Sequence, residues 1–262
     1  MEKQFEVVQS EQSCVIGEQT VRGRVYRADR DGRLPLVVCS HGFAGTFATV
    51  EPYAQAVAAQ GLAAYAYDFR GGSAQSTSDG DTTEMSVMTE VGDLEAVMSA
   101  AADWPFVDSS RMVLLGASQG GYVSAVAAAR QPAAVTALIL LYPAFVAGDD
   151  MHKAFSSLSD VPERLFYRNR LEVGRKYFTD LWDYDPYEEM GRFRGPVLII
   201  HGTADKVVPL SYSERAREVY GDAELKVVAG GGHGFQGADR SQAIADVISF
   251  LRSVHILPTE GR

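Results

Sequence analysis

Residues 111–121 read Arg-Met-Val-Leu-Leu-Gly-Ala-Ser-Gln-Gly-Gly, an apolar run that leads into a serine flanked by glycines. The run Arg111–Leu115 predicts a buried strand, and Gln119–Arg130 predicts the helix that follows it. Ser118 would then occupy a tight turn with a strained backbone, where a side chain at either flanking glycine would collide with the strand or the helix. A glycine-rich turn that carries an inert serine is the alternative interpretation.

Short apolar runs and helical stretches alternate along the rest of the chain. The predicted strands are Thr20–Arg27, Leu34–Ser40, Leu62–Asp68, Arg111–Leu115, Val135–Leu141, Val197–His201 and Leu225–Val228. The predicted helices are Val50–Gln60, Met85–Ala102, Gln119–Arg130, Tyr212–Tyr220 and Ser241–Val254. This alternation predicts an α/β fold with a mostly parallel sheet and helices on both faces, in which Thr20–Arg27 is an edge hairpin strand.

One segment, 144–194, breaks this rhythm. It shows no clear strand but is dense in aromatic side chains: Phe145, Phe155, Phe166, Tyr167, Tyr177, Phe178, Trp182, Tyr184 and Tyr187. A connection of this length usually carries its own structure or a function. We therefore expect a single domain over residues 1–262, with a helical, lid-like subdomain inserted over about 144–194.

Composition excludes several classes of protein. With 262 residues, 46% hydrophobic and 22% charged, the chain has ordinary globular composition and can bury a large core. A formal net charge of −10 and the lack of a basic cluster argue against a nucleic-acid partner. No apolar run is long enough to span a membrane, so we expect no membrane partner. The N-terminus has no signal-peptide pattern, which makes a cytoplasmic protein the default.

No metal or cofactor site is evident in the sequence. Cys14 and Cys39 form neither a CxxC pair nor a zinc pattern; a disulfide between them stays open, although the apolar run around Cys39 favours a buried thiol. The acidic residues Asp79, Asp81 and Glu84 lack the ligand spacing for calcium or zinc. No phosphate-binding glycine motif follows a strand, so we expect neither a metal nor another cofactor.

A serine hydroxyl becomes a good nucleophile only when a base takes its proton. In the enzymes whose nucleophile turn this one resembles, the acid and then the histidine follow the serine in the chain. Asp205 comes just after the predicted strand Val197–His201, and His233 follows Leu225–Val228 in a glycine-rich loop. We expect Ser118 to be the nucleophile, His233 the general base and then acid, and Asp205 the group that orients the histidine. Asp183, Asp185 and Asp222 compete with Asp205, but Asp205 alone follows a strand at the right place in this order.

Acyl transfer also requires two N–H donors for the oxyanion. One candidate is the backbone N–H of Gln119, directly after the nucleophile, and the other is that of Phe43 in an early loop. His41 in the same loop is expected to shape the loop, and His201 to make a structural hydrogen bond at its strand end. The turn Asp68–Gly72 is expected to be structural, with at most a surface role.

The motifs HGFAG, DFRGG, GASQGG, HGTADKVVP and GGGHGF together resemble the α/β-hydrolase superfamily, in the order of that superfamily and over nearly the whole chain. Within it, the HGF loop, the glutamine after the nucleophile and the VVP segment resemble bacterial carboxylesterases that include cinnamoyl and feruloyl esterases. The resemblance implies a cofactor-independent enzyme for aromatic and short acyl esters, with an insertion over the active site. It implies that Tyr177 or Asp149 could hydrogen-bond a phenol, although we expect most aromatics of 144–194 to form the insertion's own core. The DFRGG turn lacks the histidine that many relatives have after DFRG.

We therefore expect a serine carboxylesterase that acts on a small-molecule ester through an acyl-enzyme. One alternative is a thioesterase, acyltransferase or peptidase with the same triad; the 262 residues hold no large N-terminal propeller such as many peptidase relatives carry. A second alternative is a non-catalytic binding protein on the same scaffold. The sequence leaves open whether the protein forms a homodimer.

Overall fold

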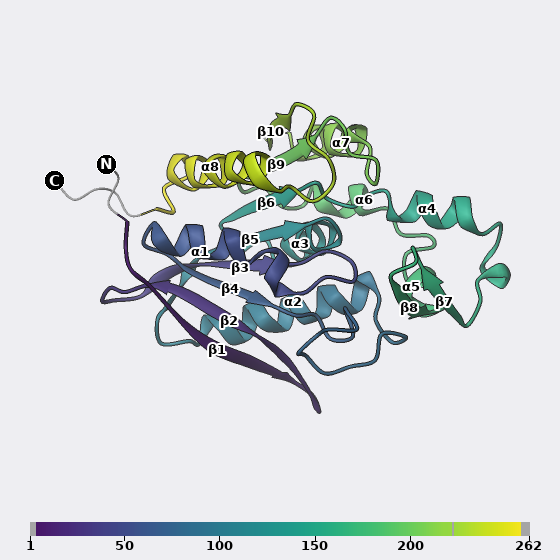
Figure 1. Cartoon of the computed structure of the whole chain (residues 1–262), viewed down its shortest axis with the longest axis horizontal. Coiled ribbons are helices and arrows are strands. Elements are labelled where there is room, and N and C mark those ends of the chain that lie inside the picture. Colours follow the sequence, from purple (N-terminus) through teal and green to yellow (C-terminus); the bar gives the residue numbers. More distant parts are fainter. Residues whose placement is uncertain (1–3, 222, 258–262) are drawn as a thin grey trace.

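The computed structural model describes residues 4–221 and 223–257, so Asp222 lies outside the described residues. The apolar runs form one eight-stranded sheet with strand order β1-β2-β4-β3-β5-β6-β9-β10 (Figure 1). The strands are β1 (Val7–Ile16), β2 (Gln19–Ala28), β3 (Leu34–Ser40), β4 (Ala63–Tyr67), β5 (Val107–Ala117), β6 (Ala137–Leu141), β9 (Val197–Gly202) and β10 (Ala223–Val228). From β4 to β10 every neighbouring pair is parallel. Their carboxyl ends therefore meet at one edge of the sheet.

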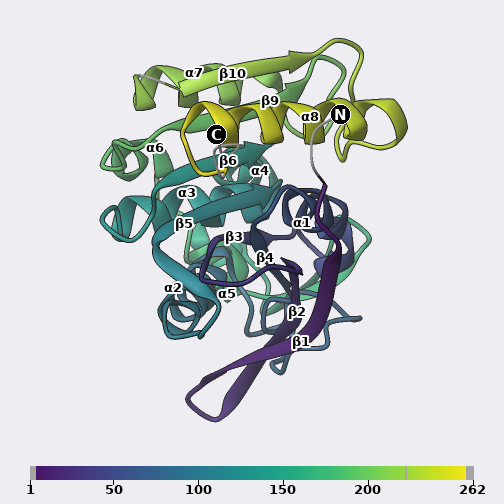
Figure 2. The same cartoon turned by 90° about the vertical axis from the view of Figure 1, so that its left-hand side faces the viewer.

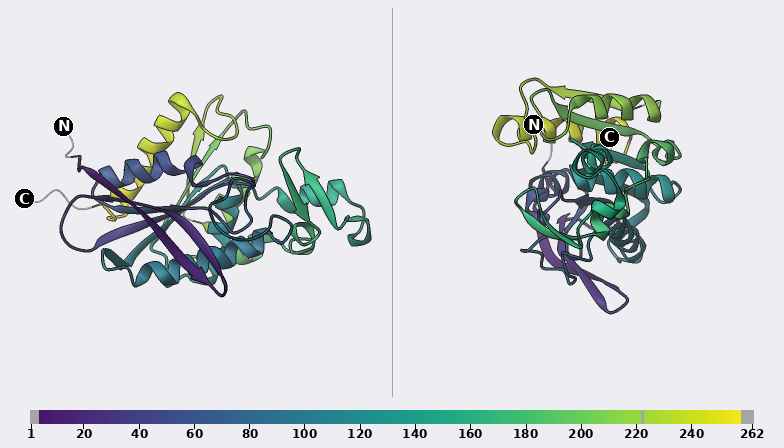
Figure 3. Two further views of the ribbon diagram at one scale, coloured as in Figure 1. Left: turned by 60° about the horizontal axis from the view of Figure 1, so that its bottom comes forward. Right: turned by 90° about the vertical axis from the view of Figure 1, so that its right-hand side faces the viewer.

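Helices cover both faces of this sheet (Figure 3). Helices α1 (Glu51–Ala59) and α8 (Gly237–Ser253) pack on one face, whereas α2 (Val87–Ala102) and α3 (Gln119–Arg130) pack on the other. α7 (Leu210–Tyr220) packs on the same face as α2 and α3. A 3-10 turn, η1 (Phe47–Thr49), precedes α1. Strand β3 is buried along its whole length because alternate side chains enter opposite cores. The predicted fold class is confirmed.

The N-terminal edge of the sheet differs from the prediction. The segment that we predicted as the edge, Thr20–Arg27, forms β2, which pairs antiparallel with β1 on one side and with β4 on the other. The edge is β1, at the end of the sheet opposite β10 (Figure 2). β1 gave only a weak signal because its sequence VVQSEQSCVI is largely polar and most of its residues are exposed or half-buried.

The segment 144–194 lies beyond the carboxyl ends of the strands (Figure 1). It contains α4 (Ala147–Ala154), η2 (Leu158–Asp160), β7 (Arg164–Tyr167), β8 (Leu171–Gly174), α5 (Lys176–Thr179) and α6 (Pro186–Met190). The insertion contains helices, as expected, but it also contains an antiparallel pair of strands, β7 and β8, that the sequence did not indicate. Each of these strands has only four residues, too few for a clear alternation of apolar and polar positions.

Most aromatics of this segment are packed in a core, but it is the main core rather than the separate core of the insertion that we expected. Phe145, Tyr177, Phe178 and Tyr187 are buried in the core on the α3 side of the sheet, and Phe155, Tyr167, Trp182 and Tyr184 pack against it. Phe166 is the exception, with 59% of its surface exposed. The insertion is thus joined to the main core through its own aromatic side chains.

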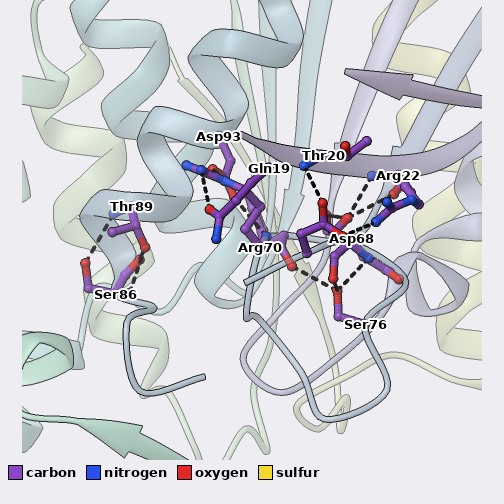
Figure 4. A network of polar contacts seen from close by, with 12 residues as sticks. Gln19, Thr20, Arg22, Asp68, Arg70, Ser76, Ser86, Thr89 and Asp93 are labelled. Atoms are coloured by element: carbon purple, nitrogen blue, oxygen red, sulfur yellow. Dashed lines mark hydrogen bonds and ion pairs between the residues drawn. The ribbon is translucent and has the colours of Figure 1, made fainter. Parts of the chain in front are cut away.

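The turn after β4 is the centre of a buried network of polar contacts (Figure 4). Asp68 is fully buried and accepts hydrogen bonds from the amides of Phe47 and Thr77 and from the Thr77 hydroxyl. Arg70 forms an ion pair with the buried Asp93 of α2 at 2.6 Å and also bonds Gln19. The prediction of a structural turn is confirmed, but the turn lies inside the protein rather than at its surface.

The two cysteines are free and buried. Cys14 belongs to the core on one face of the sheet and Cys39 to the core on the other, so they do not form a disulfide. In the part of the chain that the structure describes, no helix combines the length and the apolar character needed to cross a membrane.

The turn between β5 and α3 depends on two glycines. A Cβ atom on Gly116 would lie 2.1 Å from the Gly120 carbonyl oxygen, and one on Gly120 would lie 2.3 Å from the Ser40 carbonyl oxygen. Both neighbours are backbone atoms that cannot rotate away. The sequence-based interpretation of these glycines is therefore confirmed: they let β5, α3 and the end of β3 approach one another closely.

We predict that Gly116→Ala lowers the free energy of unfolding by at least about 2 kcal/mol, since overpacking forces the backbone to shift. Gly92 is the matched control, because it lies in helix α2, is exposed, and has open space where a Cβ would be. Gly92→Ala should raise the free energy of unfolding by about 0.5–1 kcal/mol. Urea denaturation of both variants measures this; a Gly116→Ala variant as stable as wild type would contradict it.

Candidate active site

Ser118 occupies the turn at the carboxyl end of β5, directly before α3. Its backbone has φ 54° and ψ −117°, a conformation that residues with a side chain rarely adopt. Four backbone hydrogen bonds hold it: the Ser118 amide donates to the Leu141 carbonyl, and the Ser118 carbonyl accepts from the amides of Gly121, Tyr122 and Ala144. The surrounding elements thus fix a strained residue in one orientation.

The imidazole of His233 lies between the two other predicted residues. Its Nε2 is 2.8 Å from the Oγ of Ser118, and its Nδ1 is 2.7 Å from Oδ2 of Asp205. An ionised carboxylate only accepts hydrogen bonds, so Nδ1 carries the proton and the lone pair of Nε2 faces the serine hydroxyl. The structure therefore brings together all three residues in the geometry of a nucleophile, a base and an orienting acid.

The carboxylate of Asp205 is fully buried and completely engaged. Its Oδ1 accepts from the amides of Val207 and Val208, at 2.8 and 2.9 Å. Burial alone would raise the pKa of Asp205, but the hydrogen bonds from two histidines, His201 and His233, and from the Val208 amide outweigh burial and hold that pKa well below its usual value. Asp205 is therefore ionised in the folded protein at neutral pH.

His201, at the end of β9, is a second neighbour of this carboxylate. Its Nε2 is 2.9 Å from the Val208 carbonyl oxygen and 3.3 Å from Oδ2 of Asp205, and its Nδ1 is 2.7 Å from the Ser213 hydroxyl. A carbonyl oxygen only accepts, so Nε2 donates to it and lies toward the carboxylate as well. The predicted structural role of His201 is confirmed, and it includes support of Asp205.

The two residues predicted to provide the oxyanion donors belong to the cavity of Ser118. Phe43 and Gln119 both line the cavity that contains the serine. The loop of Phe43 packs directly on the nucleophile, because a Cβ on Gly42 would lie 3.0 Å from the Cβ of Ser118. The two backbone amides are thus candidates to receive the charge of a carbonyl oxygen at Ser118.

His41 shapes this loop, as predicted. It is buried, its Nε2 accepts from the Phe69 amide at 3.2 Å, and its Nδ1 donates to the Gly42 carbonyl oxygen at 2.8 Å. Burial lowers the pKa of His41, although the bond to Gly42 and the charge of Asp68 oppose that shift. A neutral His41 thus joins the Phe43 loop to the turn after β4.

A buried polar chain runs behind the cavity and was missed in the sequence. The hydroxyl of Tyr177, from the insertion, donates to Oε1 of Gln119 at 2.7 Å, and Nε2 of Gln119 donates to Glu90 of α2 at 2.8 Å. Burial raises the pKa of Glu90 well above its usual value, as does the nearby Asp93, whereas the bond from Gln119 lowers it. Gln119 thus connects the insertion to α2 at the residue whose amide is a candidate oxyanion donor.

The cavity around Ser118 has a volume of about 360 Å³. Its walls are mostly apolar or aromatic and include Phe43, Tyr142, Tyr167, Tyr177, Val207 and Val208. A small concave site with apolar walls and a few polar groups is typical of a pocket for a small molecule.

The structure separates the two residues that the resemblance suggested for substrate binding. Tyr177 lines the cavity, but its hydroxyl is bonded to Gln119. Asp149 does not line the cavity: it belongs to a neighbouring hollow between α4 and α6 and accepts a hydrogen bond from the Tyr212 hydroxyl. The suggestion that Asp149 meets a ligand beside Ser118 is therefore not supported, since α4 directs this side chain elsewhere.

Tyr142 is a further cavity residue that sequence reasoning missed. It follows β6 with φ 38°, and its ring makes edge contacts with the rings of His233 and Phe235, each at 4.9 Å between centroids. These contacts limit the rotation of the His233 imidazole. The only signal in the sequence was a tyrosine directly after an apolar strand, which is too common to single out a site.

Comparisons with known proteins agree with this arrangement. A sequence model of the prolyl oligopeptidase family matches residues 48–255. A monoacylglycerol lipase of Mycolicibacterium smegmatis is 26% identical over 87% of this chain and 91% of its own length. Non-reducing polyketide synthase prhL of Penicillium brasilianum is 36% identical over 74 residues, which are 24% of this chain but 3% of that protein.

Among solved structures, Est1E from Butyrivibrio proteoclasticus with bound ferulic acid superposes with a TM-score of 0.84 at 20% identity. The match covers 93% of this chain and 99% of Est1E. At this identity the likeness establishes a common fold. The family model that matches residues 48–255 confirms the resemblance to the α/β-hydrolase superfamily that the motifs indicated.

The buried Glu90 generates a prediction about pH. Above the usual pKa of glutamate, about 4.3, the unfolded chain releases this proton while the folded chain keeps it, so the free energy of unfolding falls as pH rises toward the folded pKa. Glu90→Gln removes this loss and keeps an oxygen that accepts from Gln119. It should raise the free energy of unfolding at pH 8 by on the order of 1 kcal/mol, with less gain at pH 5.

Urea denaturation at several pH values measures this effect. Glu95→Gln is the matched control, because Glu95 lies on the same helix and is only half-buried. Equal stability of the Glu90→Gln and wild-type proteins across this range would contradict the prediction, as would the same pH-dependent gain in Glu95→Gln.

Proposed function

This chain belongs to the prolyl oligopeptidase family of α/β-hydrolases, and from that premise we propose that it is a serine esterase that cleaves small carboxylic esters through an acyl-enzyme. The observation that carries the proposal is the position of His233, with Nε2 at 2.8 Å from the Ser118 hydroxyl and Nδ1 at 2.7 Å from Asp205. A binding protein would not need a serine, a histidine and an aspartate that are linked by hydrogen bonds.

The first half of the reaction forms the acyl-enzyme. Ser118 Oγ attacks the ester carbonyl carbon while its proton passes to Nε2 of His233, and the ionised Asp205 stabilises the imidazolium. The carbonyl oxygen becomes an oxyanion that accepts from the amides of Phe43 and Gln119. The bond to the alcohol oxygen then breaks, and His233 returns the proton to the leaving alkoxide.

The second half releases the acid. A water molecule gives a proton to His233 as its oxygen attacks the acyl carbon, and the same two amides hold the second oxyanion. The bond to Ser118 breaks, and its Oγ regains the proton from His233. Apart from this water, the proposed steps use side chains and amides of this chain.

The cavity supports a small ester with an apolar or aromatic acyl group. Phe43, Tyr167 and Tyr177 contact one another with ring centroids 5.4–5.6 Å apart, next to the serine. Such rings provide apolar surface and edge-to-face contacts for an aromatic group. The solved structure of Est1E with ferulic acid and the lipase name of the Mycolicibacterium relative support an ester over an amide.

A peptidase is the second candidate, because the matching family is named for oligopeptide hydrolysis. The same triad would cleave an amide bond, and thioesterase and acyltransferase activities use it too. The class of leaving group distinguishes these activities experimentally.

We expect turnover of p-nitrophenyl acetate, p-nitrophenyl butyrate and methyl ferulate, and slower turnover of p-nitrophenyl laurate, an acyl-CoA and a peptide p-nitroanilide. Ser118→Ala should lower kcat for every substrate by at least about three orders of magnitude, because it removes the nucleophile. Product release with both proteins, and circular dichroism to show that the variant is folded, measure this.

The outcomes separate the candidates. Turnover restricted to the anilide or the thioester would overturn the ester substrate but keep the triad. Turnover by Ser118→Ala at the wild-type rate would exclude the mechanism, and a wild-type protein inert toward the whole panel would favour a binding protein.

The role of Asp205 predicts that Asp205→Asn lowers kcat by roughly three to four orders of magnitude with a smaller change in KM, since His233 loses its tautomer and its charge partner. Asp183→Asn is the control, because Asp183 is exposed and does not line the cavity. Steady-state kinetics with p-nitrophenyl butyrate decide; comparable rates for the two variants would remove Asp205 from the mechanism.

A further inference from the structure

Two arginines line the cavity that contains Ser118. Arg168 and Arg170 come from the turn between β7 and β8, and no aspartate or glutamate is among the residues of the cavity wall that the structure describes. The chain as a whole has a formal net charge of −10. The cavity wall thus carries two cationic side chains and no acidic one, although the protein as a whole is acidic. This distribution gives the cavity a positive electrostatic potential, which attracts anions.

The turn that carries these arginines is strained. Arg168 and Asn169 have φ of 52° and 53°, in the left-handed region, and the Arg170 amide closes the turn onto the Tyr167 carbonyl oxygen at 3.1 Å. Asparagine tolerates this region, but an arginine gains nothing from it, and glycine would fit without cost. Strain of this kind is retained where a side chain has a use, and Arg168, one of the two strained residues, lines the cavity.

The two arginines differ in their surroundings. The guanidinium of Arg168 forms an ion pair with Asp150 of α4 and lies 5.5 Å from the centre of the Tyr167 ring. It is therefore held in place and partly neutralised. Arg170 is an exposed residue of the cavity wall and makes no ion pair with any residue of 4–221 or 223–257, so no protein counter-ion neutralises its charge.

We infer that the ester hydrolysed at this site carries a carboxylate, which Arg170 binds with the support of Arg168 while the ester carbonyl lies at Ser118. This inference rests on the proposed function. The planar guanidinium donates two parallel hydrogen bonds to a carboxylate, which a solvated surface lysine would not match. The aromatic rings of Tyr167 and Tyr177 line the same cavity and would contact the part of the substrate between its two polar ends.

The carboxylate could belong to the acyl group or to the alcohol, and two pairs of esters distinguish these sources. The acyl pair is p-nitrophenyl hydrogen adipate against p-nitrophenyl hexanoate. The alcohol pair is p-carboxyphenyl butyrate against phenyl butyrate. Within each pair the ratio of kcat/KM, anionic over neutral, measures recognition of the carboxylate independently of the catalytic machinery.

Arg170→Gln should lower this ratio about fivefold for one of the two pairs, a typical size for the loss of a partly exposed ion pair. Arg164→Gln is the matched control: Arg164 lies on the same hairpin, pairs with Glu172 and does not line the cavity. This control should leave both ratios unchanged, because it removes the same charge away from the cavity. The pair whose ratio falls identifies the side of the ester that carries the carboxylate.

Two results would overturn the inference alone: neither ratio falls in Arg170→Gln, or Arg164→Gln lowers the ratio by as much, which would indicate a long-range charge effect. A wild-type protein that turns over none of the four esters would overturn the proposed function together with the inference. Turnover of the neutral esters that depends on Ser118 keeps the proposed function whatever happens to the ratios.

Discussion

The left-handed backbone of Ser118 is the constraint on which the rest of the site depends. Its φ of 54° is maintained by hydrogen bonds to β6, to α3 and to the first residue of the insertion, Ala144. Those bonds form only because the glycines at 116 and 120 let β5, α3 and the end of β3 approach within backbone contact. A strained conformation survives when several packed elements oppose its relaxation, and here the elements are the centre of the sheet and its crossover helix.

The electrostatics of the site follow from the burial of Asp205. A buried carboxylate is costly unless its oxygens are hydrogen-bonded, and this one has partners from its own loop, from His201 and from His233. The Asp205 loop is also joined to the histidine loop, since the Ala204 amide donates to the Gly231 carbonyl oxygen at 2.9 Å. The hydrogen bond that His233 donates to the buried carboxylate of Asp205 therefore also orients the imidazole.

The insertion provides side chains that line the cavity, and it also forms hydrogen bonds with the elements around the active site. Tyr177 reaches Gln119, and Asp180 accepts from Ser86 at the N-terminus of α2, at 2.6 Å. In addition, a Cβ on Gly174 of β8 would lie 2.0 Å from the Thr83 carbonyl oxygen, so the hairpin packs closely on the loop before α2. These contacts place the aromatic rings of the insertion, and the turn that carries Arg168 and Arg170, at the cavity of the serine.

The sequence by itself determined the strand–helix alternation, the turn at Ser118 and the order of Ser118, Asp205 and His233, because these depend on local periodicity, on glycine and on position at strand ends. It did not reveal β1, the β7–β8 hairpin, the chain from Glu90 through Gln119 to Tyr177, or the position of Asp149 outside the cavity. Only the tertiary structure decided these, because polar or four-residue strands leave little periodic signal, and contacts between residues such as Tyr177 and Gln119, 58 positions apart, depend on how the elements pack.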